Sequence, residues 1–266
     1  MAWNITSHVS KITSGEASKV NIDRSVLQSS TVAGRQIRLA ILLPHTGEWS
    51  AEFVEKTWIP LKSRPLDWCE KQFYLCRVPS LPLARNILVA EALKNDCQFL
   101  FWVDSDMIIE SCQDINDALK TLYNCLVETG ESIVSGLYRA KQVHGFNYAM
   151  WKKAPPELNK RGYVHVSEWS GNWINVDTVG IGACLMRSKV FEQLKQPYFH
   201  WEEPDCESED FNLLSKCREL GIKIWVFTDV KFSHIGNMVL ECRPDEVECP
   251  KCKTKIPITK FRVPAV

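Results

Sequence analysis

Short apolar segments alternate with amphipathic ones through the first half of the chain, and this alternation constrains the fold more than any other feature. Four segments are predicted to be buried strands, because they are apolar and too short for buried helices: residues 37–44, 73–78, 99–103 and 132–135. Helical periodicity starts at Pro82, and a second helix is expected at residues 115–128. This order of strands and helices predicts an α/β fold, with a mostly parallel sheet flanked by helices.

The second half of the chain continues the pattern less regularly. Strands are expected at residues 176–186 and 222–227, a short edge strand at 231–234, and helices at 188–194 and 208–220. Residues 145–171 are aromatic and polar without a clear period, which favours a loop-rich insertion. The chain is therefore divided into a polar arm (1–35), one α/β domain (36–237) and a small cysteine-rich tail (238–266).

The composition is ordinary for a soluble globular protein, with 45% hydrophobic and 24% charged residues. Lys+Arg and Asp+Glu balance at 32 each, so the charge gives no signal for nucleic acid or an anionic membrane surface. No apolar run approaches the roughly 18 to 20 residues that span a bilayer. The first 30 residues lack the apolar core of a secretory signal. We therefore expect a cytoplasmic protein whose eleven cysteines are reduced thiols.

Two acids follow the strand predicted at residues 99–103. Asp104 and Asp106 are thereby placed at the sheet edge where open α/β sheets bind ligands. Carboxylates two residues apart share one face of an extended chain, so both can turn toward one hard cation, Mg²⁺ or Mn²⁺, which would neutralise a diphosphate. Acids after a strand are also common in turns, and on this segment alone a solvated pair of turn residues is an equal alternative.

A second pair of acids, Glu209 and Asp210, stands at the predicted start of a helix. Acids there complement the helix dipole, and on their own these two are better explained as part of a helix cap. The order of these acids and of other motifs along the chain favours a functional role instead. The Asp pair comes first, Gly180 and Gly182 interrupt a later strand, the Glu-Asp pair follows, and His234 comes after the last buried strand. Chemistry with a metal-bound diphosphate, a carboxylate base and one more ligand would use these residue types.

Because these motifs follow one another in this order, residues 37–237 resemble nucleotide-sugar glycosyltransferases of the GT-A (Rossmann-like) fold, in particular family-2-like enzymes. Each motif is degenerate alone, but their common order over about 200 residues makes the resemblance specific. Residues 145–171 and the region after residue 237 do not take part in the resemblance. The segments that carry it are Ala-Arg-Asn at 84–86, Val-Asp-Ser-Asp at 103–106, and residues 133–138, 176–187, 208–211, 219–225 and 233–236.

The resemblance implies a metal site and a catalytic base. Asp104 and Asp106 match the D-x-D motif that holds Mn²⁺ or Mg²⁺ against the donor diphosphate, and His234 matches a histidine that often completes the metal shell. The alternative for His234 is a core or edge histidine. Asp210 matches the acid that deprotonates the acceptor hydroxyl in inverting members, and Glu209 would substitute for it or orient it.

The resemblance also implies residues that bind the nucleotide sugar. Arg85 would stabilise negative charge on the donor, unless it only forms an ion pair on the helix surface. Gly180 and Gly182 would leave room for a sugar, unless they only mark a strand bulge. The remaining donor-binding residues would be Asp104 and, after the first strand, where the family places the base and ribose, Pro44, His45 and Thr46.

The tail contains three cysteines, Cys242, Cys249 and Cys252, the last two in a Cys-x₂-Cys spacing typical of zinc ligands. A closed structural zinc site needs four ligands, so a fourth would come from another part of the chain. Cys69 and Cys76 are better candidates for it than Cys206. The alternative is a tail with reduced, unliganded cysteines.

The sequence thus predicts a metal-dependent enzyme that transfers a sugar from a nucleotide-sugar donor to an acceptor hydroxyl, with inversion preferred. The acceptor is left open among a glycan, a lipid, a protein and a nucleobase-linked hydroxyl. One alternative is a nucleotidyltransferase of similar architecture, although the loop after the first strand lacks the expected Gly-rich, basic character. Another is a non-catalytic module that binds a partner through the zinc knuckle.

Overall fold

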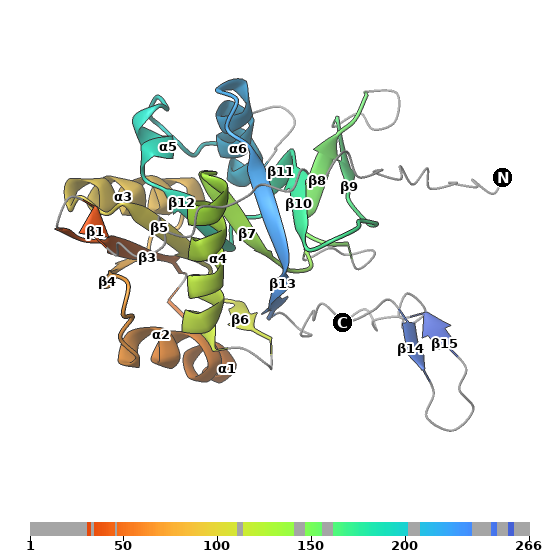
Figure 1. Ribbon diagram of the computed structural model, residues 1–266, viewed down its shortest axis with the longest axis horizontal. Coiled ribbons are helices and arrows are strands. Elements are labelled where there is room, and N and C mark those ends of the chain that lie inside the picture. Colours follow the sequence, from red (N-terminus) through yellow and green to blue (C-terminus); the bar gives the residue numbers. More distant parts are fainter. Residues whose placement is uncertain are drawn as a thin grey trace.

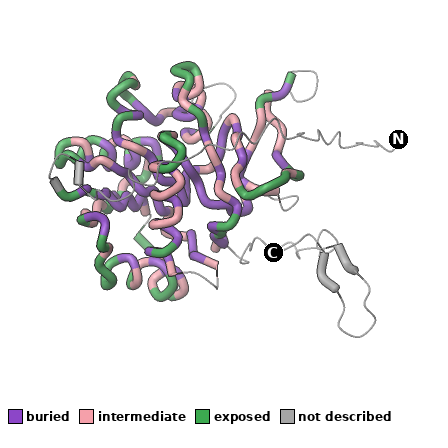
Figure 2. The backbone as a smooth tube through the Cα atoms, in the orientation of Figure 1, coloured by how far each residue is buried: buried purple, intermediate pink, exposed green. Residues whose placement is uncertain are grey.

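The structure is a computed structural model that describes residues 31–32, 35–45, 47–110, 114–140, 147–155, 162–201, 208–235, 246–248 and 255–257. In these ranges a central sheet of eight strands is covered by helices, and α4 crosses in front of the strands in the view of Figure 1. The interior strands are buried, and most of the exposed residues lie in the helices and in the loops between the elements (Figure 2).

The central sheet brings together strands from both halves of the chain. Its order is β10 (Trp173–Val176), β13 (Ile224–His234), β7 (Ile133–Leu137), β12 (Ala183–Arg187), β5 (Phe99–Val103), β3 (Arg38–Pro44) and β4 (Glu70–Cys76), and β6 (Met107–Ile109) pairs with β13. Strands β4, β3, β5, β7 and β13 run in one direction, and β12, β10 and β6 run in the other. The predicted α/β fold with a mostly parallel sheet is therefore confirmed.

Helices connect the strands on the surface of the sheet. They are α1 (Ala51–Phe53), the π-helix η2 (Val54–Trp58), α2 (Ile59–Ser63), α3 (Leu81–Lys94), α4 (Ile115–Thr129), α5 (Lys189–Glu192) and α6 (Glu209–Glu219). Helix α4 begins where the Asp114 side chain accepts from the backbone N–H of Asn116 at 2.7 Å, and it ends at Gly130, which has a left-handed φ of 71°. No helix in the described ranges is long and apolar enough to cross a membrane.

Smaller sheets complete the described part of the chain. Strands β11 (Thr178–Val179), β8 (Met150–Lys153) and β9 (Tyr163–His165) form a three-stranded sheet. Two short pairs are β1 (Thr31–Val32) with β2 (Arg35–Gln36), and β14 (Glu246–Glu248) with β15 (Lys255–Pro257).

The structure corrects three local predictions. Residues 150–153 and 163–165 are strands within the segment expected to be loop-rich, because β8 pairs with both β9 and β11. Residues 231–234 are not a separate edge strand but the end of the long strand β13, where they pair with β6. The helical turns at residues 51–63 were not expected at all.

Candidate active site

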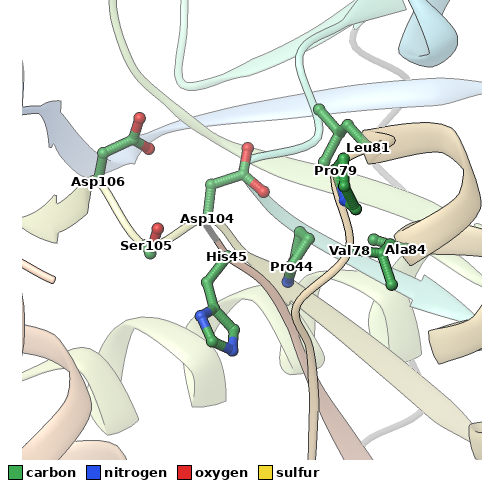
Figure 3. Close-up of a pocket in the computed structure, with 9 residues that line it drawn as sticks. All are labelled: Pro44, His45, Val78, Pro79, Leu81, Ala84, Asp104, Ser105 and Asp106. Carbon is green, nitrogen blue, oxygen red and sulfur yellow. The ribbon is translucent and has the colours of Figure 1, made fainter. Parts of the chain in front are cut away.

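A small pocket opens at the end of β3 and β5, beside the first pair of acids. Its volume is about 200 Å³, and Figure 3 shows its lining: Pro44, His45, Val78, Pro79, Leu81, Ala84, Asp104, Ser105 and Asp106. The carboxylates of Asp104 and Asp106 extend to the same side of the turn between them (Figure 3). Apolar side chains and carboxylates thus line the same pocket, as a ligand with both an apolar and a charged portion would require.

Backbone hydrogen bonds hold the turn that carries these two acids. The backbone N–H of Asp104 donates to the carbonyl of Gly182 at 3.0 Å, and the N–H of Met107 donates to the carbonyl of Asp104 at 3.0 Å. On the other side, the N–H of Ile235 donates to the carbonyl of Asp106 at 2.7 Å. The position of the turn is therefore set by the strands on both of its sides.

The pairing of β6 with β13 brings His234 to the acid turn. The His234 Nε2 atom lies 3.4 Å from Asp106 Oδ2, and its Nδ1 atom lies 3.2 Å from the carbonyl oxygen of Arg139. Three of the predicted metal ligands, Asp104, Asp106 and His234, are thus in one region of the sheet edge.

The donor atoms in this region fit a divalent cation. Asp104 Oδ1 is a buried oxygen without a hydrogen-bond partner among the described residues. Carboxylate oxygens and an imidazole nitrogen are ligands that Mn²⁺ accepts. In the described ranges, however, no three His, Cys, Asp or Glu side chains are gathered so that they could hold an ion as they stand. Asp104 faces Arg85 and Asp106 faces His234, so a bound ion would replace these contacts.

Arg85 of α3 lies at the centre of the acids. Its side chain is 2% exposed, and it makes contacts with Glu209 (Nε to Oε1, 3.1 Å), Asp104 (Nη2 to Oδ2, 3.3 Å) and Asp210 (Nη2 to Oδ1, 3.6 Å). The guanidinium also lies over the ring of Trp102, 5.3 Å from its centroid. Arg85 is therefore a buried counter-ion, and the alternative of an ion pair on the helix surface is wrong.

Burial and the charges around Arg85 shift the pKa values of Arg85, Asp104 and Asp210. Burial by itself would lower the pKa of Arg85, but the three carboxylates outweigh it and raise this pKa. Burial raises the pKa of Asp104 despite the nearby guanidinium. Burial also raises the pKa of Asp210 to about 7, with contributions from Glu209 and Asp104. Three carboxylates around one cation leave excess negative charge, so Asp210 is poised to exchange a proton near neutral pH.

The backbone between β11 and β12 holds Asp210 from the other side. The N–H of Ile181 donates to Asp210 Oδ2 at 3.2 Å. At the next residue, the N–H of Gly182 donates to the hydroxyl oxygen of Tyr138 at 3.1 Å, and its carbonyl accepts from Asp104. Residues 180–182 therefore connect the two pairs of acids through backbone groups. Ser208 occupies the N-cap position of α6 but makes no side-chain capping bond.

Both glycines of this connection are needed for close packing inside the protein. A Cβ atom on Gly180 would lie 2.2 Å from the Tyr138 hydroxyl oxygen, and one on Gly182 would lie 2.9 Å from Asp104 Oδ2. The space beside each glycine is thus occupied by a side chain of this candidate site. Their role in leaving room for a sugar stays a prediction.

Tyr138 and Trp201 belong to the site but were not assigned roles from the sequence. Tyr138, at the end of β7, is 5% exposed, and its ring packs edge-on against that of His234, with centroids 5.8 Å apart. Trp201 donates its indole N–H to Glu209 Oε2 at 3.3 Å. Only the contact with Glu209 reveals Trp201, because its segment has no periodic pattern.

Some predicted residues lie outside the described part of the chain: Thr46, Cys206, Cys242, Cys249 and Cys252. The zinc site therefore stays a prediction. Of the two preferred candidates for its fourth ligand, Cys69 and Cys76 are both buried thiols, and burial raises the pKa of Cys69 to about 12. The apolar or helix-like surroundings of five other cysteines predict small core residues: Cys97, Cys112, Cys125, Cys184 and Cys217. Cys97, Cys184 and Cys217 are buried, Cys125 is half-buried, and Cys112 lies outside the described residues.

Solved structures of other proteins share this fold. The crystal structure of A197 from STIV matches with 17% sequence identity and a TM-score of 0.51, over 77% of this chain and 90% of that one. GalNAc-T7 with UDP, GalNAc and Mn²⁺ matches with 12% identity and a TM-score of 0.51, over 75% of this chain and 44% of that one. This chain thus spans less than half of the GalNAc-T7 chain.

No protein-family model and no curated protein matches the sequence. The structural likeness confirms that this chain has the GT-A fold, the fold of GalNAc-T7. At these identities the likeness establishes the fold, and the chemistry has to be argued from the site itself.

Proposed function

We propose that this protein is a metal-dependent glycosyltransferase that moves a sugar from a nucleotide-sugar donor to an acceptor hydroxyl, with inversion at the sugar. One observation carries the proposal. Two pairs of acids, Asp104 with Asp106 and Glu209 with Asp210, meet at one sheet edge beside a pocket with apolar walls. The GT-A fold supports it, since GalNAc-T7 was solved with UDP, GalNAc and Mn²⁺.

The nucleotide of the donor would occupy the pocket at the end of β3. Pro44 and His45 line it, and the His45 ring packs edge-on against Trp49 with centroids 5.5 Å apart, which fixes the ring in place. The diphosphate would then lie toward Asp104 and Asp106. Two carboxylates repel a diphosphate unless a cation lies between them, which is the physical reason to expect a metal here.

Asp104, Asp106 and His234 would hold Mn²⁺ or Mg²⁺, because their atoms are of the right chemistry and Asp104 Oδ1 has no other hydrogen-bond partner in the described part of the chain. A bound divalent ion would neutralise the negative charge that develops on the departing diphosphate.

Asp210 would be the base that accepts the proton of the acceptor hydroxyl. A base with a pKa near the working pH is effective, and burial raises the pKa of Asp210 to about 7. Ile181 N–H holds one oxygen of Asp210, which fixes the direction of the carboxylate. Glu209 is turned to Arg85 and Trp201, so we assign it a positioning role.

Arg85 would act through the acids more than on the donor. Its guanidinium is buried among Asp104, Glu209 and Asp210, and these contacts hold both pairs of acids at fixed separation. A carboxylate held in place by a partner loses less conformational entropy when the substrate binds.

The nucleotidyltransferase alternative is not favoured by these observations. The described residues after β3 lack the Gly-rich basic loop that would cradle a triphosphate, and the compared structures include a protein solved with UDP and GalNAc. The cytoplasmic location and the tail zinc stay predictions.

Calorimetry with UDP and Mn²⁺ tests the proposal directly. We expect the purified full chain to bind UDP in the presence of Mn²⁺ and to lose this binding when the metal is chelated. Asp106→Asn should weaken UDP–Mn²⁺ binding by roughly tenfold or more, since one metal ligand loses its charge. The exposed Asp117→Asn of α4 serves as the matched control. Equal affinity of the wild-type chain for UDP with and without Mn²⁺, or no effect of Asp106→Asn, would refute the metal assignment.

A further inference from the structure

Trp201 exposes an unusually large apolar ring beside the acid cluster. It is 58% exposed, the largest fraction among the large hydrophobic residues that the structure describes as exposed. A tryptophan in this state forgoes much of the stabilisation that burying its ring would give. Its indole N–H is nevertheless directed inward, to Glu209 Oε2 at 3.3 Å. The ring is therefore held at a defined place while more than half of the residue remains exposed to solvent.

The contact with Glu209 ties the position of this ring to the proposed catalytic base. Glu209 has a side chain that is 6% exposed, and its second oxygen, Oε1, accepts from Arg85 at 3.1 Å. Arg85 in turn lies 3.6 Å from Asp210. Trp201 thus stands at the solvent end of a continuous polar chain that ends at the base.

We propose that Trp201 forms an acceptor subsite that takes a glycosyl unit, with the apolar face of the sugar stacked on the indole ring. This inference rests on the proposed function, because it takes Asp210 as the base that receives the proton of the acceptor hydroxyl. It selects a glycan among the acceptor classes that the sequence left open.

The chemistry around Trp201 favours a sugar over the other acceptors. A pyranose ring combines an apolar C–H face with hydroxyl groups at its edge. Trp201 offers a flat apolar face of similar size, and its N–H contact with Glu209 places this face next to the residue that precedes Asp210. An acyl chain would need a longer apolar path than one ring provides, and a hydroxyl without a stacking face would leave the ring unused.

The experiment measures sugar binding separately from donor binding. Saturation-transfer NMR on the full chain would use the methyl α- and β-glycosides of glucose, galactose, mannose and N-acetylglucosamine, with 1-octanol and N-acetyltyrosinamide as probes of the rival acceptor classes. We expect at least one glycoside to bind, with the strongest saturation on the protons of one ring face. Trp201→Ala should weaken that binding about tenfold or more, while calorimetric affinity for UDP with Mn²⁺ stays unchanged.

Two further variants separate stacking from a structural role of Trp201. Trp201→Phe keeps an aromatic face but loses the indole N–H, so glycoside binding should stay within about threefold of wild type. Leu220→Ala, at the far end of α6 and also strongly exposed (49%), is the matched control and should change nothing. Equal losses in Trp201→Ala and Trp201→Phe would mean that only the hydrogen bond to Glu209 matters, and would overturn the subsite.

The remaining outcomes also decide the matter. Absence of binding by every glycoside, or binding that survives Trp201→Ala, overturns the inference, and binding of octanol or N-acetyltyrosinamide at Trp201 would replace it with a lipid or protein acceptor. Failure of the proposed function gives a different result: the wild-type chain would then show no metal-dependent binding of UDP, whether or not it binds a glycoside.

Discussion

The two pairs of acids at this sheet edge are held in different ways. Asp104 and Asp106 stand on a turn whose backbone is hydrogen-bonded on both sides, to Gly182 and Ile235. Glu209 and Asp210 depend mainly on side-chain contacts, above all with Arg85, which is 124 residues away from Glu209 in the sequence. The backbone of the first pair is fixed by the sheet, although Asp104 also contacts Arg85. The second pair is held mainly through Arg85, with one backbone hydrogen bond from Ile181 to Asp210. Substitutions should therefore affect the two pairs unequally.

Removing the buried charge should have the largest effect. Arg85→Leu leaves three carboxylates without their shared cation, and breaking a buried ion pair in this way costs about 3–5 kcal/mol of stability. The loss should shrink as the pH falls from 8 to 5, because the carboxylates can then take up protons. Chemical denaturation at both pH values measures it.

Two companion variants make the Arg85 result interpretable. Adding Asp210→Asn to Arg85→Leu should recover part of the stability, since one unpaired charge next to Arg85 is removed. Adding Asp106→Asn should recover less, because the Asp106 carboxylate lies against His234. Equal recovery from both would mean that Asp106 depends on Arg85 as much as Asp210 does, which contradicts the comparison.

Loss of Asp210, the proposed base, comes next in size. Asp210→Asn should reduce the rate of sugar transfer by roughly 10²-fold or more while UDP–Mn²⁺ affinity stays near that of wild type. The wild-type rate should rise with pH through about 7, since the pKa of Asp210 is raised to about 7 and the base acts in its ionised form. Nucleoside diphosphate release across pH 5.5 to 8.5 measures both.

Asp210 should also make the free energy of unfolding of the wild-type protein fall as the pH rises. Its folded pKa lies above the ordinary value of 3.8, so its contribution is present at low pH and is lost as the pH rises through about 7. Asp210→Asn should therefore weaken this decline. If Glu209→Gln reduces turnover more than Asp210→Asn does, the two acids have exchanged roles.

The two pairs of acids also differ in how well their positions could be predicted from the sequence. The strand that ends at Val103 places Asp104 and Asp106 by local rules, so the position of this pair was predictable. The segment with Glu209 and Asp210 was placed correctly at a helix start, but its connection to Arg85 is a contact between distant segments that no local pattern encodes. The same is true of Tyr138, whose hydroxyl fills the space beside Gly180.

Residues 180–182 connect the two pairs of acids through backbone groups, and a substitution at Gly180 would strain this connection. Gly180→Ala would place a Cβ atom 2.2 Å from the hydroxyl oxygen of Tyr138, so we expect a loss of about 1–3 kcal/mol in stability, together with slower turnover. Tyr138→Phe removes the atom in conflict. The double variant Gly180→Ala/Tyr138→Phe should therefore be less destabilised than the sum of the two single variants, as thermal denaturation would measure. Additive effects would mean that the connection tolerates the extra methyl group in another way.

The smallest effect is expected at His165 of β9, which does not line the pocket. His165 Nε2 accepts from the Trp151 indole N–H at 3.2 Å, so the ring is neutral there and its Nδ1–H donates to the carbonyl of Tyr148 at 3.1 Å. Trp151 in turn packs edge-on against Phe211, the residue after Asp210, and the two ring centroids lie 4.9 Å apart. Burial lowers the pKa of His165 below 6.5.

A histidine that is kept neutral in the folded state stabilises the protein less as the pH falls below 6.5, because the unfolded chain takes up the proton more readily. His165→Phe should cost about 1 kcal/mol at pH 7.5, through the lost hydrogen bonds, and less at pH 5. Melting temperatures of both proteins at the two pH values give this difference. The pH effect should reach the acceptor side through Phe211 and leave UDP–Mn²⁺ affinity unchanged, since the donor acids are held by the backbone of the sheet. A parallel loss of UDP affinity at pH 5 in wild type, absent from His165→Phe, would show that the two sides are coupled after all.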